Sequence, residues 1–203
     1  MNLLFMGVQG SGKGTQAKII ASKLNLIHIS TGDLLRDTKG ELKEEVNLYM
    51  ASGKLVPDKL IIKILKNQLK EESCKNGVIL DGFPRNLEQA EEADKIMKID
   101  KAVEIAISNE EAIKRLAGRW NCKKCSNSYN LITSLKPKKN GICDICGREL
   151  YQRKDDIKEE AVKKRLETYH KETKPVLKHY SSVKINGEQS IEKVTRDIIN
   201  SLK

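Results

Sequence analysis

Residues 7–15 read Gly-Val-Gln-Gly-Ser-Gly-Lys-Gly-Thr, directly after the apolar run at 3–6 and directly before a helical pattern. Glycines at positions 7, 10 and 12 let the backbone curve so tightly that successive N–H groups point into one concavity, where an anion can bind. The positive end of the following helix and the Lys13 ammonium add charge for the outer phosphates of a nucleoside triphosphate. A glycine-rich turn without a ligand is the alternative, and the strand before it and the helix after it favour the phosphate loop.

The rest of the chain alternates short apolar segments with helical patterns. Strands are predicted at 3–6, 26–30, 77–81, 102–107 and 182–185. Asn25 is the expected left-handed end of the first helix, and Asp58 is the expected N-cap of a later one. We also expect residues 31–33 to end the second strand and a charged helix to span 34–50. Buried strands alternating with helices are typical of an α/β fold with a doubly wound parallel sheet, in which Asp81, at the end of its strand, faces the ligand crevice.

The composition limits the classes of protein. The chain has 203 residues, enough for one sizeable α/β domain with a small insertion, and its formal net charge of +10 favours anionic partners. Because the basic residues are scattered along the chain, we attribute most of the excess to solubility. The apolar run at 3–6 is too short for a signal peptide, and no stretch approaches the roughly 20 apolar residues of a membrane span. We therefore expect a cytoplasmic protein.

Four of the five cysteines form two Cys-x-x-Cys pairs, Cys122 with Cys125 and Cys143 with Cys146, separated by 17 residues. This spacing is typical of a four-cysteine zinc ribbon, whose closed tetrahedral site is structural. Bound zinc would supply folding free energy, of order 10 kcal/mol, that a mostly polar segment cannot gain from a core. A redox dithiol is the alternative, although two matched pairs exceed what that chemistry needs. The other cysteine and the histidines are expected to be structural or exposed: Cys74, His28, His170 and His179.

Further motifs follow in an order that resembles one family. They are Ser30-Thr31-Gly32-Asp33 with Arg36, Leu55-Val56-Pro57-Asp58, Asp81-Gly82-Phe83-Pro84-Arg85 with Gln89, Gly118-Arg119, and Arg153-Lys154-Asp155-Asp156 with Arg165. With the glycine-rich loop and the cysteine pairs, they make essentially the whole chain similar to bacterial adenylate kinases of the zinc-containing, long-lid type. This resemblance accounts for Gly14, where the general phosphate-loop pattern has Ser or Thr. The stretch 38–43 is shorter than in the family, and Cys146 stands where some relatives have Asp.

The resemblance implies a P-loop NTPase-type fold and the reaction ATP + AMP ⇌ 2 ADP, with Mg²⁺ bound to ATP and structural Zn²⁺. It implies a core domain made of 1–29, 57–117 and 156–203, an AMP-binding insertion at 30–56 and a zinc-binding lid insertion at 118–155. Both insertions would close over the substrates and exclude water. The expected partners are ATP, AMP and ADP, with no nucleic acid and no membrane, and the expected state is a monomer.

The resemblance also implies roles for individual residues. ATP would be bound by Gly10, Ser11, Gly12, Lys13, Gly14, Thr15, Arg119, Ser128, Tyr129 and Gln189. AMP would be bound by Thr31, Arg36, Lys54, Leu55, Val56, Gly82, Phe83, Pro84, Arg85, Gln89, Arg153 and Arg165. Phosphoryl transfer would involve Lys13, Asp81, Arg85, Arg119, Arg153 and Arg165. Zinc would be bound by Cys122, Cys125, Cys143 and Cys146.

The chemistry of these residue types agrees with the implied roles. The AMP phosphate is already an anionic nucleophile, so no general base is needed, and arginines can align and neutralise two polyanions. Asp81 is expected to organise water on Mg²⁺, and the amide of Gln89 suits a purine edge. Two other functions stay open. One is a kinase for UMP or CMP, against which Gln89 and Thr31 argue; the other is a basic zinc-ribbon protein that binds nucleic acid, for which Tyr129 and Tyr151 make no stacking platform.

Overall fold

The computed structural model describes residues 1–36, 38, 42–51, 56–132 and 135–203. Its centre is a five-stranded sheet in the order β2-β3-β1-β4-β8, with every neighbouring pair parallel. The strands are β1 Leu3–Met6, β2 Ile27–Ser30, β3 Val78–Asp81, β4 Lys101–Ala106 and β8 Ser182–Asn186. The predicted doubly wound parallel sheet is confirmed, and the glycine-rich loop leaves it from its central strand.

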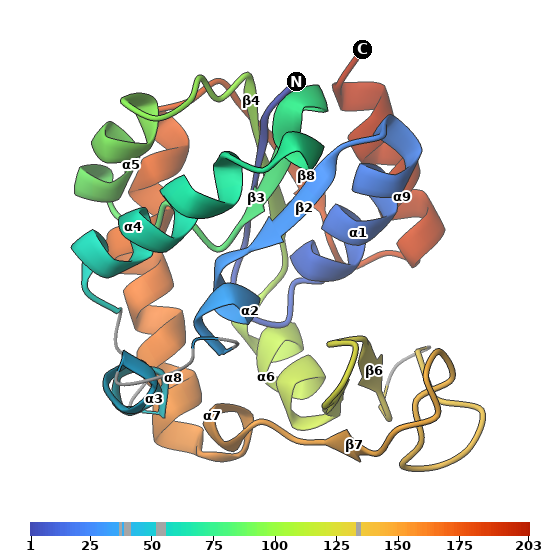
Figure 1. The fold of residues 1–203 in the computed structure, drawn as a ribbon. Helices are drawn as coiled ribbons and strands as arrows, with labels where there is room; N and C mark the ends of the chain where they lie inside the picture. Colours follow the sequence, from blue (N-terminus) through green and yellow to red (C-terminus); the bar gives the residue numbers. More distant parts are fainter. Residues whose placement is uncertain (37, 39–41, 52–55, 133–134) are drawn as a thin grey trace.

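Helices cover both faces of this sheet (Figure 1). They are α1 Lys13–Leu24 and α9 Ile191–Ser201 on one face, and α4 Asp58–Leu69 and α5 Leu87–Asp94 on the other. Alternate residues of β1 belong to the two cores: Leu3 and Phe5 pack with the first pair of helices, and Leu4 and Met6 with the second. Burial on both faces explains why the strands are continuous apolar runs and not alternating patterns.

Two helix ends test the predicted caps. Asn25 follows α1 with a φ of 54°, so the predicted left-handed end is confirmed. The predicted N-cap at Asp58 is wrong, because α4 begins at this residue with Pro57 at the cap position. The Asp58 carboxylate instead accepts a hydrogen bond from Gln89 Nε2 at 2.5 Å, and this partner lies 31 residues away in the sequence. A tertiary contact has replaced the local one.

The segment after β2 also differs from the prediction. The structure has two helices here, α2 over Thr31–Arg36 and α3 over Leu42–Ala51. The predicted end of the strand at 31–33 is confirmed, since β2 ends at Ser30. The helix begins at Thr31 and not at 34, because the Ser30 hydroxyl accepts a hydrogen bond from the Asp33 N–H at 3.2 Å and caps the first turn of α2. Residues 37 and 39–41, which the predicted single helix over 34–50 includes, lie outside the described residues.

A nearly continuous helical run leads back to the sheet (Figure 1). It consists of α7 Lys154–Ile157, α8 Glu159–Thr168, a π-helical turn at Tyr169–Thr173 and a 3₁₀ turn at Lys174–Lys178. The Tyr169 hydroxyl donates to the buried Glu104 of β4 at 3.2 Å, which ties the π-helical turn to the sheet. A separate 3₁₀ turn at Glu72–Asn76 holds Cys74, a free cysteine that is buried.

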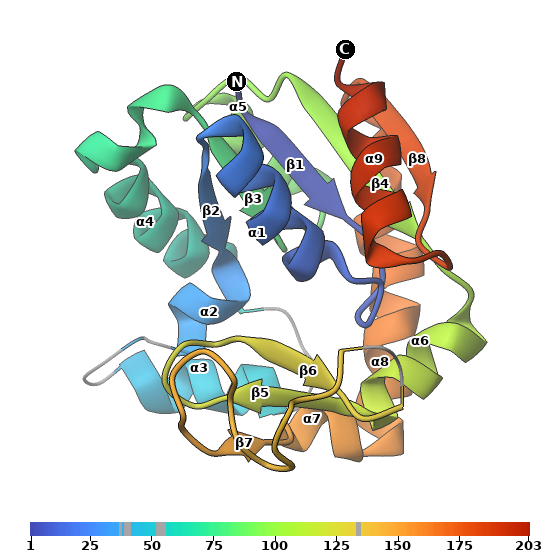
Figure 2. The same cartoon turned by 90° about the vertical axis from the view of Figure 1, so that its right-hand side faces the viewer.

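A second, smaller sheet follows α6 (Asn109–Ala117) and is antiparallel in the order β6-β5-β7. Its strands are β5 Arg119–Cys122, β6 Ser128–Asn130 and β7 Leu150–Tyr151. Its buried hydrophobic residues are Cys122, Tyr129, Cys143 and Leu150, so sulfur and a phenol ring replace most of an aliphatic core. Figure 2 shows this sheet across from the carboxyl ends of β1 and β2. Within the described ranges, no helix has the length and apolar content to span a bilayer.

Candidate functional site

The loop between β1 and α1 curves around the N-terminus of the helix. Gly7, Gly10 and Gly12 have φ values of 149°, 86° and 91°. A Cβ on Gly7 would lie 2.5 Å from the carbonyl oxygen of Ile105, so a larger residue does not fit there. Gly12 occupies the N-cap of α1 and offers no side-chain acceptor. The first N–H groups of the helix are therefore free to bind an anion.

Lys13 begins α1 and is partly buried beneath this loop. Its Nζ donates to the Val8 carbonyl at 3.3 Å. Desolvation lowers the pKa of Lys13 to about 8; Asp81 opposes this change, whereas nearby guanidinium groups add to it. An ammonium crowded by other cations is stabilised when an anion arrives, so the environment of Lys13 is suited to a phosphate.

Asp81 stands at the carboxyl end of β3, as predicted, and faces the glycine-rich loop. A Cβ on Gly14 would lie 3.2 Å from its Oδ2. The same oxygen lies 3.3 Å from Nε2 of His28, on the neighbouring strand β2. Burial raises the pKa of Asp81, but the hydrogen bond with His28 and the charge of Lys13 outweigh burial and hold this pKa below its usual value. Asp81 is therefore a carboxylate, the type of group that binds a hydrated divalent cation.

One cleft joins the glycine-rich loop, the end of the parallel sheet and the small sheet. Its volume is about 990 Å³, at the upper end of the roughly 300–1,000 Å³ typical of small-molecule sites. The residues predicted to bind nucleotides that line it are Gly10, Ser11, Gly12, Lys13, Gly14, Thr15, Thr31, Arg36, Val56, Gly82, Pro84, Arg85, Arg119, Ser128, Tyr129, Arg153, Arg165 and Gln189. Asp81 lines it as well. Side chains from the whole length of the chain thus meet at one place.

Four residues predicted to bind AMP are not part of this lining. Phe83 is buried in the core of the main sheet. Gln89 is 0% exposed: its Oε1 accepts from the Arg85 N–H at 2.7 Å, and its Nε2 donates to Asp58. The remaining two lie outside the described residues: Lys54 and Leu55. In this conformation Gln89 supports the turn that carries Arg85 and offers no edge to the cleft.

Three side chains predicted to bind ATP line the cleft and already hold internal hydrogen bonds. Gln189 Nε2 donates within its own turn, at 2.8 Å. The Ser128 hydroxyl donates to Asn121 Oδ1 at 2.9 Å. The Tyr129 hydroxyl accepts from the Asp144 N–H at 2.7 Å. A nucleotide at these positions would share or exchange these bonds.

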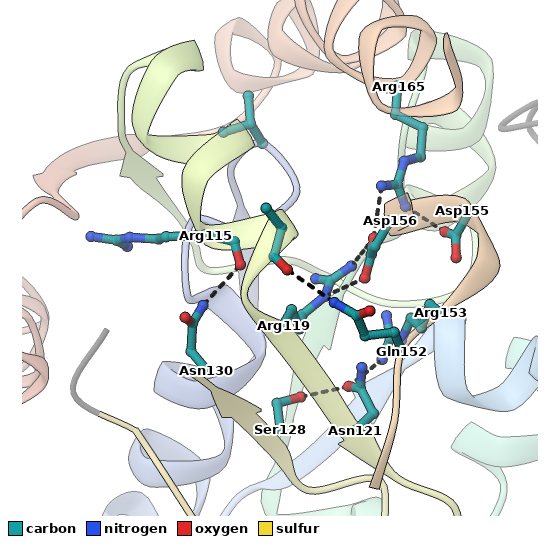
Figure 3. Close-up of polar contacts among 12 residues, drawn as sticks. Arg115, Arg119, Asn121, Ser128, Asn130, Gln152, Arg153, Asp155, Asp156 and Arg165 are labelled. Atoms are coloured by element: carbon teal, nitrogen blue, oxygen red, sulfur yellow. Dashed lines mark hydrogen bonds and ion pairs between the residues drawn. The ribbon is translucent and has the colours of Figure 1, made fainter. Parts of the chain in front are cut away.

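Six arginines line the cleft, and two of them converge on Asp156 (Figure 3). Arg119 donates from Nε at 2.7 Å and from Nη2 at 2.6 Å, and Arg165 donates from Nη2 at 2.8 Å. Arg165 also contacts Asp155. Burial raises the pKa of Asp156, but the charges and hydrogen bonds of the two arginines outweigh burial and hold this pKa below its usual value. The carboxylate fixes two guanidinium groups at the edge of the cleft.

The other four arginines of the cleft are held differently. Their contacts are Arg36 to Asp33 (2.5 Å), Arg115 to Glu111 (2.7 Å), Arg85 to the Gly82 carbonyl (2.6 Å) and Arg153 to Asn121 Oδ1 (3.1 Å). Within the described residues, no carboxylate therefore lies within hydrogen-bonding distance of Arg85 or Arg153. These two guanidinium groups have no ion-pair partner in that part of the chain, although Asp81 lies near Arg85, and Asp156 and Asp33 lie near Arg153.

The structure gives a place at the cleft to titratable groups that the sequence reasoning gave no role. His28, Arg115 and Asp155 line the cleft, and Asp156 holds Arg119 and Arg165. The signal for Arg115 was its position in the last turn of a helix that leads to Arg119. The signal for the two aspartates was an acidic pair between Arg153 and Arg165. His28 had no signal, since its contact with Asp81 depends on strand pairing between β2 and β3.

The four cysteines of the small sheet come together as predicted. Their Sγ atoms all lie within 4.8 Å of one another. A tetrahedral zinc ion with Zn–S bonds of about 2.3 Å holds its sulfurs roughly 3.8 Å apart, so the arrangement fits. Ser126 and Gly147 follow the two Cys-x-x-Cys turns with φ values of 52° and 68°, which turns the chain back toward the sulfurs. No other group of three or more metal-binding side chains occurs in the described part of the chain.

Comparison with known proteins covers nearly the whole chain. The family model of adenylate kinase matches residues 5–185. The chain is 44% identical to the adenylate kinase of Caldicellulosiruptor saccharolyticus, over 100% of this chain and 99% of that protein. It is 44% identical to the adenylate kinase of Clostridium tetani, over 100% and 98% of the two chains. It is 45% identical to the adenylate kinase of Methanothrix thermoacetophila, over 98% and 96%.

Proposed function

Since this chain belongs to the adenylate kinase family, we propose that it catalyses ATP + AMP ⇌ 2 ADP in the cleft described above, with Mg²⁺ bound to ATP. The observation that carries the proposal is the charge distribution of the cleft. A phosphate loop, a buried carboxylate and six arginines face one volume of about 990 Å³. Transfer between two polyanions needs alignment and charge neutralisation far more than it needs an acid or a base.

We assign the ATP phosphates to the glycine-rich loop. The free N–H groups at the start of α1 and the Lys13 ammonium would bind them, with Arg119 on the opposite side of the cleft. Ser128, Tyr129 and Gln189 would contact the rest of ATP. The partly buried Lys13 supports this assignment, because burial and nearby guanidinium groups destabilise its ammonium and a bound phosphate would offset both effects.

We assign AMP to the side of the cleft formed by α2 and the turn after β3. Thr31, whose hydroxyl donates to the Asp81 carbonyl at 3.2 Å, and Arg36 belong to this side, as do Gly82 and Arg85. Gln89 would contribute only if its contact with Asp58 opened. Lys54 and Leu55 lie outside the described residues, and Phe83 does not line the cleft. Contacts of these three residues with AMP stay predictions.

Arg153 and Arg165 line the same cleft and would neutralise charge on the transferred group. Arg165 is held in place before substrate arrives, by Asp155 and Asp156. Such preorganisation removes the need to reorient charged groups during the reaction. The AMP phosphate would attack as an anion, so no residue of the cleft has to remove a proton.

The residues present fit the proposed Mg²⁺. Asp81 is an ionised, buried carboxylate beside Gly14, and Thr15 is the nearest loop hydroxyl in the sequence. Asp81 would hold the hydration shell of the ion, and Thr15 would offer a ligand oxygen. Bound to ATP, Mg²⁺ neutralises the charge that develops on the phosphate oxygens.

We further propose the division into a core (1–29, 57–117 and 156–203), an AMP-binding insertion (30–56) and a lid (118–155). The lid would contain a structural zinc ion bound by the four cysteines. Support comes from the separate antiparallel sheet and from the sulfurs within 4.8 Å of one another. A monomeric state and a cytoplasmic location are predictions of the same proposal.

The test is ADP formation from Mg·ATP with AMP, UMP, CMP or GMP, using protein of known zinc content. We expect turnover with AMP and little with the other three acceptors. Turnover with UMP or CMP alone would keep phosphoryl transfer and overturn the assignment of AMP. A folded, zinc-containing protein that forms no ADP with any acceptor would overturn the proposed function.

A further inference from the structure

Asn121 occupies an unusual position at the edge of the cleft. It lies on β5 and is 1% exposed. Its Oδ1 accepts two hydrogen bonds, from the Ser128 hydroxyl at 2.9 Å and from Arg153 Nη2 at 3.1 Å (Figure 3). Its Nδ2 is buried and has no partner among the described residues. Two donors therefore fix the orientation of the amide, with its oxygen toward Arg153.

The buried Nδ2 indicates that this orientation is not chosen for stability. A buried donor without an acceptor destabilises the fold, and an apolar side chain of similar size would avoid that loss. Such a group in a native structure calls for an explanation, and a role at a functional site is one. Asn121 reaches the cleft through its contacts with Ser128 and Arg153, and Arg153 is the charged one of the two.

Arg153 differs from most of its neighbours in the partner it has. Arg36, Arg115, Arg119 and Arg165 each contact a carboxylate, whereas the hydrogen-bond acceptor of Arg153 is the neutral oxygen of an amide. Burial, followed by repulsion from Arg119 and Arg36, lowers the pKa of Arg153 to about 10. Asp156 and Asp33 oppose this change through their charges, but neither forms an ion pair with Arg153, whose guanidinium is held by a neutral acceptor.

We propose that Asn121 is a positioning residue for Arg153, whose neutral carbonyl oxygen directs the guanidinium toward the cleft and leaves its positive charge available to substrate phosphate. The inference rests on the proposed function, which assigns phosphate contacts to Arg153. A carboxylate in the same place would orient the arginine equally well. The carboxylate would also neutralise the charge of Arg153, and substrate phosphate would then have to compete with an internal anion.

The proposal predicts that N121D, the more conservative of two substitutions, weakens nucleotide binding more than N121A does. N121D changes the shape of the side chain very little but pairs Arg153 with a carboxylate. N121A removes the whole amide but leaves the charge of Arg153 free. We expect N121D to weaken Mg·ATP binding and to raise the KM for both nucleotides roughly tenfold, and N121A to change them less while lowering kcat. If Asn121 only supports the lid structurally, the order is reversed, because Asp is nearly isosteric with Asn.

The measurements are calorimetric titration with Mg·ATP and initial rates with ATP and AMP, for wild type, N121D, N121A and N140D. Asn140 is an exposed asparagine of the small-sheet region outside the cleft, so N140D makes the same charge change away from Arg153. Melting temperature and zinc content identify any variant that is misfolded. Weaker binding in N121D than in N121A, with N140D unchanged, supports the proposal. Equal or reversed affinities overturn it, and because binding is measured without turnover, this holds even if the wild type forms no ADP.

Discussion

Asp156 accepts two N–H groups of Arg119, from Nε at 2.7 Å and from Nη2 at 2.6 Å, and its side chain is 0% exposed. Replacing it by Asn leaves Arg119 and Arg165 close together without the buried negative charge between them. Loss of one partner from a buried ion pair typically lowers the free energy of unfolding by about 3–5 kcal/mol. We predict a loss of this size for D156N, measured by urea unfolding at pH 7. E91Q, which removes an exposed carboxylate of α5, should change stability little.

The pH dependence of stability tests whether the loss in D156N comes from the ion pairs of Asp156 with Arg119 and Arg165. The pKa of Asp156 is lower in the folded protein than in the unfolded chain, since Arg119 and Arg165 outweigh the effect of burial. The stabilisation is therefore complete above the unfolded pKa of about 4 and is lost as the pH falls through the folded pKa below it. The difference in stability between wild type and D156N should be constant from pH 7 to pH 5 and narrow below pH 4. A difference that stays constant in acid contradicts an ionic origin.

Lys13 makes nucleotide binding depend on pH in the alkaline range. Its pKa in the free protein is lowered to about 8, and a bound phosphate would raise it again. ATP binding at pH 8.5 should therefore take up a fraction of a proton, whereas binding at pH 6.5 should involve none at this residue. Calorimetry in two buffers with different ionisation enthalpies measures the uptake. K13Q, which has no ammonium, should bind more weakly and show no such uptake; equal uptake in K13Q assigns the proton to another group.

The contact of Asp58 with Gln89 predicts an effect on one substrate only. Gln89 also accepts from the backbone N–H of Arg85, so Asp58 indirectly supports the turn that carries this arginine. We expect D58A to raise the KM for AMP about tenfold, the usual effect of losing a charge-assisted hydrogen bond, and to leave the KM for ATP nearly unchanged. E88Q, at an exposed position next to Gln89, is the matched control. A rise of the same size for both nucleotides is inconsistent with this assignment.

The parts of the fold and site that sequence reasoning predicted are those determined by neighbouring residues. The phosphate loop follows from glycine spacing between a strand and a helix, the end of α1 from Asn25, and the sulfur cluster from two short Cys-x-x-Cys turns. Each of these depends on dihedral preferences or spacing that the local sequence states directly. Asp81 also belongs here, because a polar residue that ends an apolar strand must lie at the edge of the sheet.

The parts that sequence reasoning missed depend on contacts between distant segments. Asp58 has the right residue type for an N-cap, but Gln89, 31 residues away, takes its carboxylate. Asp156 meets Arg119 across 37 residues, and no local pattern indicates which acid will pair with which arginine. The π-helical turn at Tyr169–Thr173 continues α8, and its Tyr169 hydroxyl donates to the buried Glu104 of β4. This turn thus contacts a strand of the parallel sheet that is 65 residues away in the sequence.

Removal of the proposed zinc should loosen the small sheet and leave the parallel sheet intact. The buried hydrophobic residues of the small sheet are Cys122, Cys143, Tyr129 and Leu150, so half of this core consists of proposed zinc ligands. The parallel sheet has two aliphatic cores of its own. Hydrogen exchange with and without a chelator should therefore show faster exchange in residues 118–155 and unchanged exchange in the strands of the parallel sheet. Because structural zinc sites contribute on the order of 10 kcal/mol to folding, the effect should be large. Equal protection of 118–155 in both samples would show that the four cysteines stabilise the sheet without a metal, and faster exchange throughout would show that the core is not independent of it.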